Sequence, residues 1–515
     1  MTKTEPPPET SPPKTSPPEG ILSRFLVLRS APRELWLVYY GKVMETVAYA
    51  LCNMGLMLYL INDLQFSDQG AGTFVGIWAT AFSLATFLVG SLSDALGIRK
   101  TLIFSFGACI VFRTLSALIG DPLLSPVLGL MPMAFAAAMT LPVMVAATRR
   151  FTSKEQSSMG FALLYVFMNI GFAISGKVFD WVRATMGKDG TFTMPIIGAE
   201  LSVYETIFLL SACFTLGGLL PLFLGLREGA EMPDEGDTVV IHPVKTSSSG
   251  ALETLREVLR ETGRILTEVF REPNFYRFLL FLSLVVGVRL VFYHMHYTLA
   301  PYADRELGYG SRFGTAWGVL NPLMIIVLTP IVGAVAQKVS SYKMIVVGTS
   351  FCALSCFMLV LPNDTFIGLA GSWVEGGLKW FLAIDGDFGS LYYNLIVFAF
   401  LFSIGEAIWT PRLYEYTATV APKGRESTYM GLSMLPLFFG KLIAGPMSGV
   451  LLGRYCPVDG VRRSSSLWLV VTLMAVASPV SILLLKNVVK PRETSMESDR
   501  SDKSDKSDKS KGGAA

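Results

Sequence analysis

Twelve long hydrophobic stretches constrain this chain more than any other feature, because each is close to the ~20 residues with which an α-helix crosses a bilayer. Only 16% of the residues are charged and the mean hydropathy is +0.49, whereas soluble domains carry about 25% charged residues. We therefore predict an all-α membrane protein. The predicted spans are 36–61, 72–93, 101–120, 125–147, 158–180, 205–226, 277–300, 314–337, 341–362, 390–412, 427–452 and 466–486.

Polar segments suggest how the chain is organised. Residues 1–35 begin with a run rich in Pro, Ser and Thr, and residues 487–515 contain a Ser-Asp-Lys repeat. Neither tail can bury enough apolar surface to fold, so both are expected to be disordered. The polar segment 227–276 separates a predicted six-helix bundle at 36–226 from a second at 277–486. Its apolar residues recur at helical spacing from Leu252 onward, which predicts an amphipathic helix on the membrane surface.

Charge predicts the orientation of the chain in the membrane. An even number of spans places both termini on one side, and Lys and Arg are concentrated in the tails, the linker and the loops of that side. The positive-inside rule therefore predicts cytoplasmic termini for a multi-pass membrane protein. The net charge of +3 provides no basic footprint for a nucleic acid, and we expect a monomer.

Several activities are excluded by missing patterns. The six cysteines show no metal-binding spacing, and no Gly-x-x-x-x-Gly-Lys-[Ser/Thr] phosphate loop occurs. No nucleophile, base and metal constellation lies within one leaflet, which argues against a membrane-embedded enzyme. We predict no metal, no cofactor and no enzymatic activity.

The loop after the second stretch carries the most specific motif. The segment GSLSDALGIRK occupies residues 90–100, and a weaker copy, GAVAQKVSSYK, follows the eighth stretch at 333–343. The first segment resembles the signature G-x-L-x-D-x-x-G-R-[KR] of the major facilitator superfamily. That resemblance implies two six-helix bundles around a midplane site, with this loop latching the outward-facing state. The latch residues would be Gly90, Asp94, Gly97, Arg99 and Lys100.

Within that superfamily the chain resembles the proton-dependent oligopeptide transporters. The fifth stretch contains LYVFMNIG at 164–171, similar to the family pattern F-Y-x-x-I-N-x-G. The tenth contains Gly405-Glu406 followed by Thr410-Pro411, which is similar to G-E-x-x-x-S-P. The resemblance implies that Tyr165, Asn169 and Glu406 line a substrate site.

The chain departs from this family at three charged positions. In the first stretch, Lys42 stands where the family has Glu and Thr46 where it has Arg, whereas Glu45 is kept. In the fourth stretch, Leu141 replaces a Lys. Recognition of peptides in the family's usual manner is therefore in doubt.

Ionisable residues at membrane depth cost about 2.5–3.5 kcal/mol each on insertion scales, so each needs a partner or a function. Lys42, Glu45 and Tyr49 lie on one helical face, which we expect to face the central cavity. A Lys42–Glu45 pair that satisfies itself is the alternative.

The seventh stretch carries a second polar face. Arg289, Tyr293, His296 and Tyr297 share it, whereas His294 points away. Arg289 is suited to gripping an anionic group, and His296 to carrying a coupling proton. The alternative is that the histidines and tyrosines belong to an interfacial aromatic belt.

Glu406 lies mid-span in the tenth stretch and can alternate between an ion pair and a neutral acid. Its potential partners are Arg289 and Lys441, whereas Arg113 is a buried cation without an obvious mate. The spans thus hold two more cations than anions, which favours an anionic or zwitterionic solute.

The sequence therefore predicts a secondary active transporter that moves a peptide-like, amino-acid-derived or anionic solute by alternating access, driven by protons. The alternatives are a facilitator and a transporter-derived receptor without coupled flux. A drug antiporter is disfavoured because the fifth stretch has glycines without proline. Proton-coupling candidates are Glu45, His296 and Glu406. The predicted substrate-binding residues are Lys42, Glu45, Tyr49, Tyr165, Asn169, Arg289, Tyr293, Asn321, Glu406 and Lys441.

Overall fold

The computed structural model of the chain is almost entirely helical. It describes residues 27–153, 155–195, 197–233, 239–241, 260, 264, 271, 273–335, 339–420 and 435–486. In these ranges the strands are limited to two short antiparallel hairpins, β1 (Phe192–Thr193) with β2 (Glu200–Leu201) and β3 (Ala230–Glu231) with β4 (Val240–Ile241).

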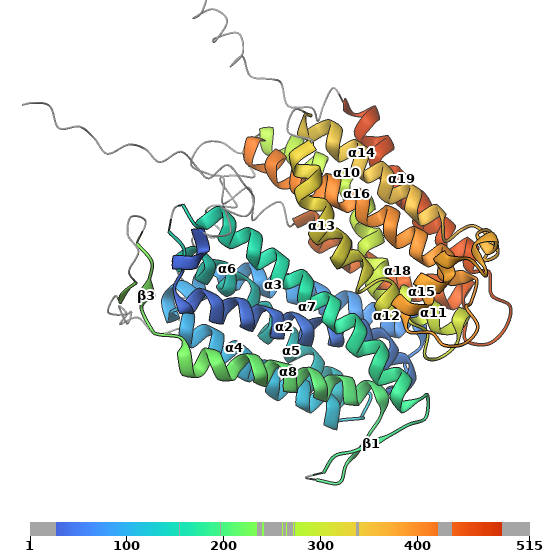
Figure 1. Ribbon diagram of the computed structural model, residues 1–515, viewed down its shortest axis with the longest axis horizontal. Coiled ribbons are helices and arrows are strands. Elements are labelled where there is room, and N and C mark those ends of the chain that lie inside the picture. The colour runs from blue at the N-terminus through green and yellow to red at the C-terminus, as the bar shows by residue number, and fades with distance from the viewer. Residues whose placement is uncertain are drawn as a thin grey trace, which may run out of the picture.

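The helices fall into two groups, which Figure 1 shows as a blue-to-green and a yellow-to-red bundle. The first group comprises the 3-10 helix η1 (Val27–Ser30), α2 (Arg33–Leu58) with its π-helical extension η2 (Tyr59–Asp63), α3 (Asp68–Leu96), α4 (Ile98–Leu118), the π-helix η3 (Ser125–Leu130), α5 (Met131–Ala138), α6 (Thr140–Arg150), α7 (Ser157–Met186) and α8 (Val203–Gly225). The second comprises α10 (Pro273–Tyr297), α11 (Leu299–Leu307), α12 (Phe313–Ala316), α13 (Leu320–Val335), α14 (Ser341–Phe357), the 3-10 helix η4 (Ile367–Leu369), α15 (Trp373–Leu382), α16 (Leu391–Val420), α18 (Leu435–Tyr455) and α19 (Ser464–Leu484).

Each predicted hydrophobic stretch coincides with helix. Within the described residues, nine helical segments are long and apolar enough to cross a membrane. The remaining three stretches correspond to α3, α14 and α18, although 427–434 lies outside the described residues. The predicted amphipathic helix of the linker and both tails also lie outside them, apart from isolated residues and the ends adjoining the bundles. Helix α15 was not predicted.

The two bundles meet at one end and diverge toward the other (Figure 1). We call the end with the 63–68, 186–203, 307–313 and 455–464 connections the junction end. The opposite end, where α8 leads into the linker, is the linker end. The predicted orientation would place the linker end in the cytoplasm.

Glycines bring α3 and α18 into backbone contact near the junction end. A Cβ on Gly445 would lie 2.4 Å from the Cα of Gly76, and one on Gly72 would lie 2.4 Å from the carbonyl oxygen of Gly445. No side chain fits at these positions, and small residues spaced four apart allow helices to approach closely in lipid. This contact joins the two bundles.

Replacement of Gly445 by leucine is expected to force α3 and α18 apart and to lower any transport rate more than tenfold, because the side chain has no space. Initial uptake rates into proteoliposomes would measure the effect. Gly107→Leu is the control, since a Cβ there meets nothing within 4 Å. Equal rates in the two variants would contradict a functional role for the contact.

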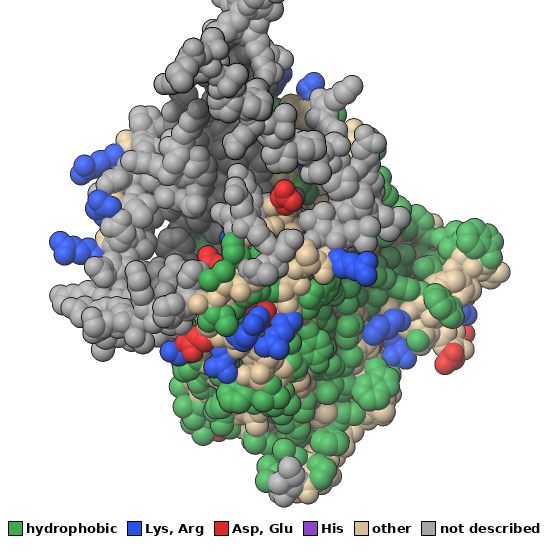
Figure 2. All heavy atoms as spheres, turned by 60° about the vertical axis from the view of Figure 1, so that its left-hand side comes forward, with side chains coloured by type: hydrophobic (Ala, Val, Ile, Leu, Met, Phe, Trp, Pro, Cys, Tyr) green, Lys and Arg blue, Asp and Glu red, His purple; other side chains and the backbone are tan. Residues whose placement is uncertain are grey.

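The flanks of the molecule are apolar and its linker end is basic. Figure 2 shows broad hydrophobic surface with Lys and Arg side chains gathered at one end, beside residues that are not described. Arg33, Lys100, Arg149 and Arg150 are exposed at this linker end. Apolar flanks of this kind match a protein whose middle lies in lipid.

Candidate functional site

The carboxylate of Glu45, in the first spanning helix, is neutralised by an arginine. Arg113 on α4 donates to both oxygens of Glu45 on α2, at 2.9 and 2.8 Å, and also to the hydroxyl of Thr215 on α8. Arg113 is 1% exposed and Glu45 is 5% exposed. The suggestion that Arg113 lacks a mate was therefore wrong, and so was the alternative of a self-satisfied Lys42–Glu45 pair. Glu45 is held inside the first bundle and does not face the second.

Lys42 interacts with the charge of Glu45 but forms no ion pair with it. Its side chain is 8% exposed, and it makes no hydrogen bond or ion pair with any residue that the structure describes. A desolvated ammonium group with unused donors is costly unless an anion or water satisfies it. Lys42 is thus available to a ligand.

The side chain of Lys441, on α18 of the second bundle, contacts α3 of the first bundle. Its Nζ donates to the Ser83 hydroxyl on α3 at 2.8 Å. It also lies 5.5 Å from the ring centre of Phe82 and 5.8 Å from that of Tyr293, and Tyr49 packs on Phe82 with ring centres 5.5 Å apart. The ammonium group of Lys441, on α18, therefore lies among side chains of α3 and α10, and Tyr49 of α2 packs on one of them, Phe82.

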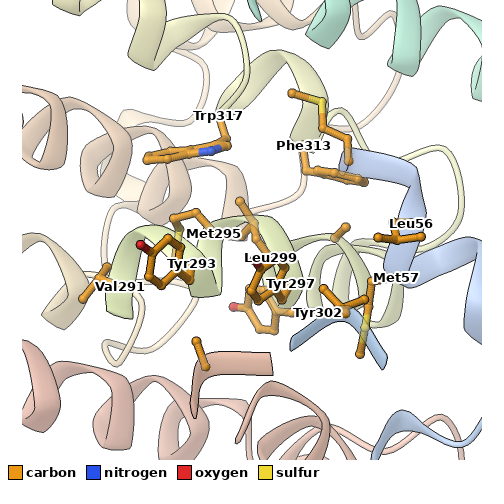
Figure 3. Close-up of a cluster of buried hydrophobic side chains, with 14 of the residues drawn as sticks. Leu56, Met57, Val291, Tyr293, Met295, Tyr297, Leu299, Tyr302, Phe313 and Trp317 are labelled. Atoms are coloured by element: carbon orange, nitrogen blue, oxygen red, sulfur yellow. The ribbon is translucent and has the colours of Figure 1, made fainter. Parts of the chain in front are cut away.

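Next to the Lys441 ammonium group, aromatic side chains of α10, α16 and the segment before α13 pack together and form one wall of the candidate site. The rings of Tyr293 and Tyr297 stack with centres 6.4 Å apart, and Figure 3 shows them on α10, with Trp317 on the facing segment. Trp317 packs against Phe398 and Phe402 of α16 at 5.6 and 5.3 Å. Such walls orient small ligands by shape, whereas a few polar groups give specificity.

Arg289 and Glu406 face this region without forming a direct pair. The guanidinium of Arg289 lies 4.6 Å from the ring centre of Trp409, and its Nε is buried without a hydrogen-bond partner. Glu406 accepts a 2.9 Å hydrogen bond from Asn321, which also donates to Ser403 at 3.0 Å. Among the described residues, Glu406 makes no ion pair within 4.0 Å, so the predicted pairing with Arg289 or Lys441 is absent in this conformation.

Two other predicted site residues, Asn169 and His296, form hydrogen bonds with carbonyl groups of their own helices. Asn169 donates to the carbonyl of Tyr165, one turn earlier in α7, so its amide is partly used by its own helix. His296 hydrogen-bonds through Nδ1 with the carbonyl oxygen of Phe292 at 2.9 Å. His294 is fully buried and contacts Thr298 and Ser448 through Nδ1, which agrees with its predicted direction away from the tyrosine face.

The latch motif lies where α3 ends and α4 begins. Gly97 has φ +84° and separates the two helices, a conformation that favours glycine. Arg99 donates to the carbonyl of Phe223 at 2.9 Å and Lys100 pairs with Glu228 at 2.9 Å, so both cations contact the end of α8 and the segment after it. Gly90 and Asp94 lie in α3, and their side chains are outside the described set.

Sequence reasoning missed a polar network between the bundles at the junction end. Arg305 donates to Asp68 at 2.9 Å, and Arg183 pairs with Asp304. Burial raises the pKa of Asp304, and Arg183 opposes that rise. Asp180 accepts hydrogen bonds from the amides of two residues in the first turn of α12, Gly314 and Thr315, at 3.0 and 2.6 Å.

The signals for this network were present as charges near the ends of predicted spans, but a charge there usually faces water. The network closes the junction end. Where the chain is described, no cluster of three or more His, Cys, Asp or Glu side chains could hold a metal ion.

Comparisons with known proteins bear on the family and the fold of the chain. The model of one protein family, the Major Facilitator Superfamily, matches residues 41–384. No curated protein matches the sequence. A solved POT family transporter in complex with 5-aminolevulinic acid is 15% identical, with a TM-score of 0.64 over 90% of this chain and 100% of that chain.

Two further solved structures are similar. A peptide transporter POT in complex with sulfate is 15% identical, with a TM-score of 0.64 over 90% of this chain and 98% of that one. Tetrameric PepTSo2 is 16% identical, with a TM-score of 0.59 over 88% and 98%. These matches confirm the predicted all-α fold and show that the solved peptide transporters share it.

Proposed function

The chain belongs to the major facilitator superfamily, and from this premise we propose that it is a proton-coupled secondary transporter of a small anionic or zwitterionic organic solute. Its bundles, 36–226 and 277–486, would rock about a midplane site. In the conformation described here the junction end is closed by glycine contacts and ion pairs. Alternating access requires these contacts to break when the opposite end closes.

The observation that carries the proposal is an excess of uncompensated positive charge around the aromatic wall. Lys441 contacts a hydroxyl and two rings, and Arg289 lies on Trp409. The carboxylate facing them is Glu406, since Glu45 is neutralised by Arg113. An anionic group would relieve the repulsion between Lys441 and Arg289.

Protonation of Glu406 provides a coupling mechanism. As a carboxylate it would bind a ligand amine or pair with a nearby cation, and as a neutral acid it would release that partner. Asn321 supports the carboxylate through one hydrogen bond in either state. The solved relatives hold 5-aminolevulinic acid and a peptide conjugate, and both chemistries suit a site with cations and one carboxylate.

The experiment that tests the function is uptake of pooled peptides, amino acids and carboxylates into proteoliposomes under an imposed pH gradient. Accumulation above equilibrium would support coupled transport and identify the substrate class. Equilibration independent of the gradient would replace the proposal with a facilitator, and absence of any flux would favour a receptor.

Replacing a positively charged residue of the site by a neutral one should weaken the binding of anionic substrates more than that of neutral ones. Lys441→Gln or Arg289→Gln is expected to raise the KM of an anionic substrate at least about tenfold, because each removes a charge-assisted contact worth about 1.5–3 kcal/mol. Initial uptake rates over a concentration series measure this change. Lys343→Gln, at an exposed position of α14, should leave the KM unchanged, and equal effects on anionic and neutral solutes would contradict charge-based recognition.

A further inference from the structure

Helix α15 lies at the junction end, between α14 and α16, and has two distinct faces. Trp373, Gly376, Gly377 and Trp380 follow helical spacing and are all exposed, the tryptophans by 88% and 84%. A Cβ on either glycine would meet nothing within 4 Å. Two large aromatic side chains therefore project from one face, largely uncovered by the residues that the structure describes.

The opposite face is attached to the bundle. Val374, Leu378 and Phe381 are half-buried on it and Leu382 is fully buried. The helix is also attached to α16, because Glu375 accepts a hydrogen bond from Tyr393 at 3.1 Å, and within the helix Glu375 pairs with Lys379 at 2.9 Å. The exposed tryptophans thus belong to a helix whose opposite face is packed against the bundle.

The surroundings of this face point to the bilayer as its partner. Leu354 and Phe357, in the last turns of α14, are exposed, so apolar surface runs from a spanning helix toward α15. Ile367, on the connection between them, is 51% exposed. Tryptophan is enriched where hydrocarbon meets headgroups, because its ring is apolar and its N–H is polar. A helix with two such side chains on one face matches an interfacial helix.

The C-terminal end of α15 bridges the two bundles. Its Phe381 carbonyl accepts a hydrogen bond from Lys177 of α7, and the carbonyl of Ala383, just after the helix, accepts one from Arg312 at 3.3 Å. Cations suit this position because helix carbonyls carry partial negative charge there. A cavity of about 440 Å³ lies along the same seam, lined by residues that include Lys177, Asp180 and Arg312.

We propose that α15 is a membrane-surface helix whose Trp373 and Trp380 insert into the headgroup region, and that this insertion stabilises closure of the two bundles at the junction end. The helix end that holds Lys177 and Arg312 lies directly after Trp380, so the depth of the tryptophans sets the position of the bridging carbonyls. The insertion is independent of what is transported. Its effect on closure rests on the proposed alternating access.

Depth is tested with a bimane fluorophore on a cysteine at position 380 of the full chain. Cys213→Ser provides the background, because the other described cysteines are buried. In vesicles of phosphatidylcholine brominated high on the acyl chain, quenching should exceed that of the same label at Asp459, an exposed loop position, by about twofold or more. Equal quenching at the two positions would overturn the insertion, as would energy transfer between labelled copies, which would indicate a second copy of the chain on this face.

Closure is tested with nitroxides at Lys188 and Asp459, exposed positions on opposite bundles at the junction end. The double variant Trp373→Ser/Trp380→Ser should shift the distance distribution toward longer values in vesicles. Phe104→Ser, which removes a lipid-exposed aromatic of α4, should not. An unchanged distribution in the double variant would overturn the role in closure. Failure of the proposed transport function would instead appear as absent flux with normal quenching at position 380.

Discussion

Replacement of Arg113 by leucine is expected to be strongly destabilising, lowering the free energy of unfolding by about 3–5 kcal/mol. The substitution leaves Glu45 buried without its two charge-assisted hydrogen bonds, and it removes the donor to Thr215. A carboxylate without a partner in this setting must be ionised at high cost or become protonated. Thermal unfolding in detergent micelles would report the loss as a lower Tm.

A double variant distinguishes loss of the pair from loss of volume. Arg113→Leu/Glu45→Met removes both charges together and should recover most of the stability, because no buried charge remains unpaired. Lys100→Met serves as the exposed comparison, since its pair with Glu228 lies at the surface and contributes about 0–1 kcal/mol. A Tm as low in the double variant as in Arg113→Leu would indicate that packing, and not charge, is what Arg113 supplies.

The Arg113–Glu45 pair also shows where sequence reasoning stopped. The sequence showed that Arg113 was buried and that Glu45 belonged to a polar face, but the partner it offered for Glu45, as an alternative to substrate contact, was Lys42, three residues away. Helical spacing identifies neighbours on one helix only. The partner came from α4, 68 residues away, and that proximity is a property of the packed bundle.

The spans themselves were predictable because lipid imposes a local rule. Backbone groups in hydrocarbon must be hydrogen-bonded within the segment, so a long apolar run becomes a helix whatever surrounds it. Every predicted stretch therefore coincides with helix. The motif at 90–100 was informative for another reason, since Gly97 adopts a positive φ between two helices.

Helix α15 was missed although it carries a local signal. Ser372 caps its first turn, and Glu375 stands three residues later, a pattern that predicts a helix start. The glycines that follow weaken helix propensity, and a loop between spans was expected at 363–389. The junction-end network was less accessible, because Asp68 and Arg305 come from different bundles and are 237 residues apart.

The same limits applied to the candidate site. The positions of Glu406, Asn321 and Arg289 at plausible depth were predicted from the sequence. Their contacts were not, since Asn321 rather than a cation holds Glu406. A carboxylate that makes no ion pair with the described residues in this conformation is free to gain one in another, which is what a coupling residue requires.

Glu406→Gln is expected to abolish proton-driven accumulation while leaving exchange of substrate for substrate across the membrane. Glutamine has nearly the same shape and keeps an oxygen that can accept the Asn321 hydrogen bond, so the fold and the site should persist. It cannot bind or release a proton, and the step that links protonation to reorientation is lost. Accumulation under a pH gradient and counterflow in its absence, measured on the same vesicles, separate these two properties.

Asn321→Ala provides the matched comparison, because it removes the hydrogen bond to Glu406 but leaves the titrating group. Coupling should survive in that variant, with the pH dependence of uptake displaced relative to the wild type. Persistent accumulation by Glu406→Gln would assign Glu406 a structural role and move the coupling site to His296. Loss of both accumulation and counterflow, with substrate binding also lost, would instead make Glu406 a substrate ligand, since a residue needed only for coupling is dispensable when no net proton movement occurs.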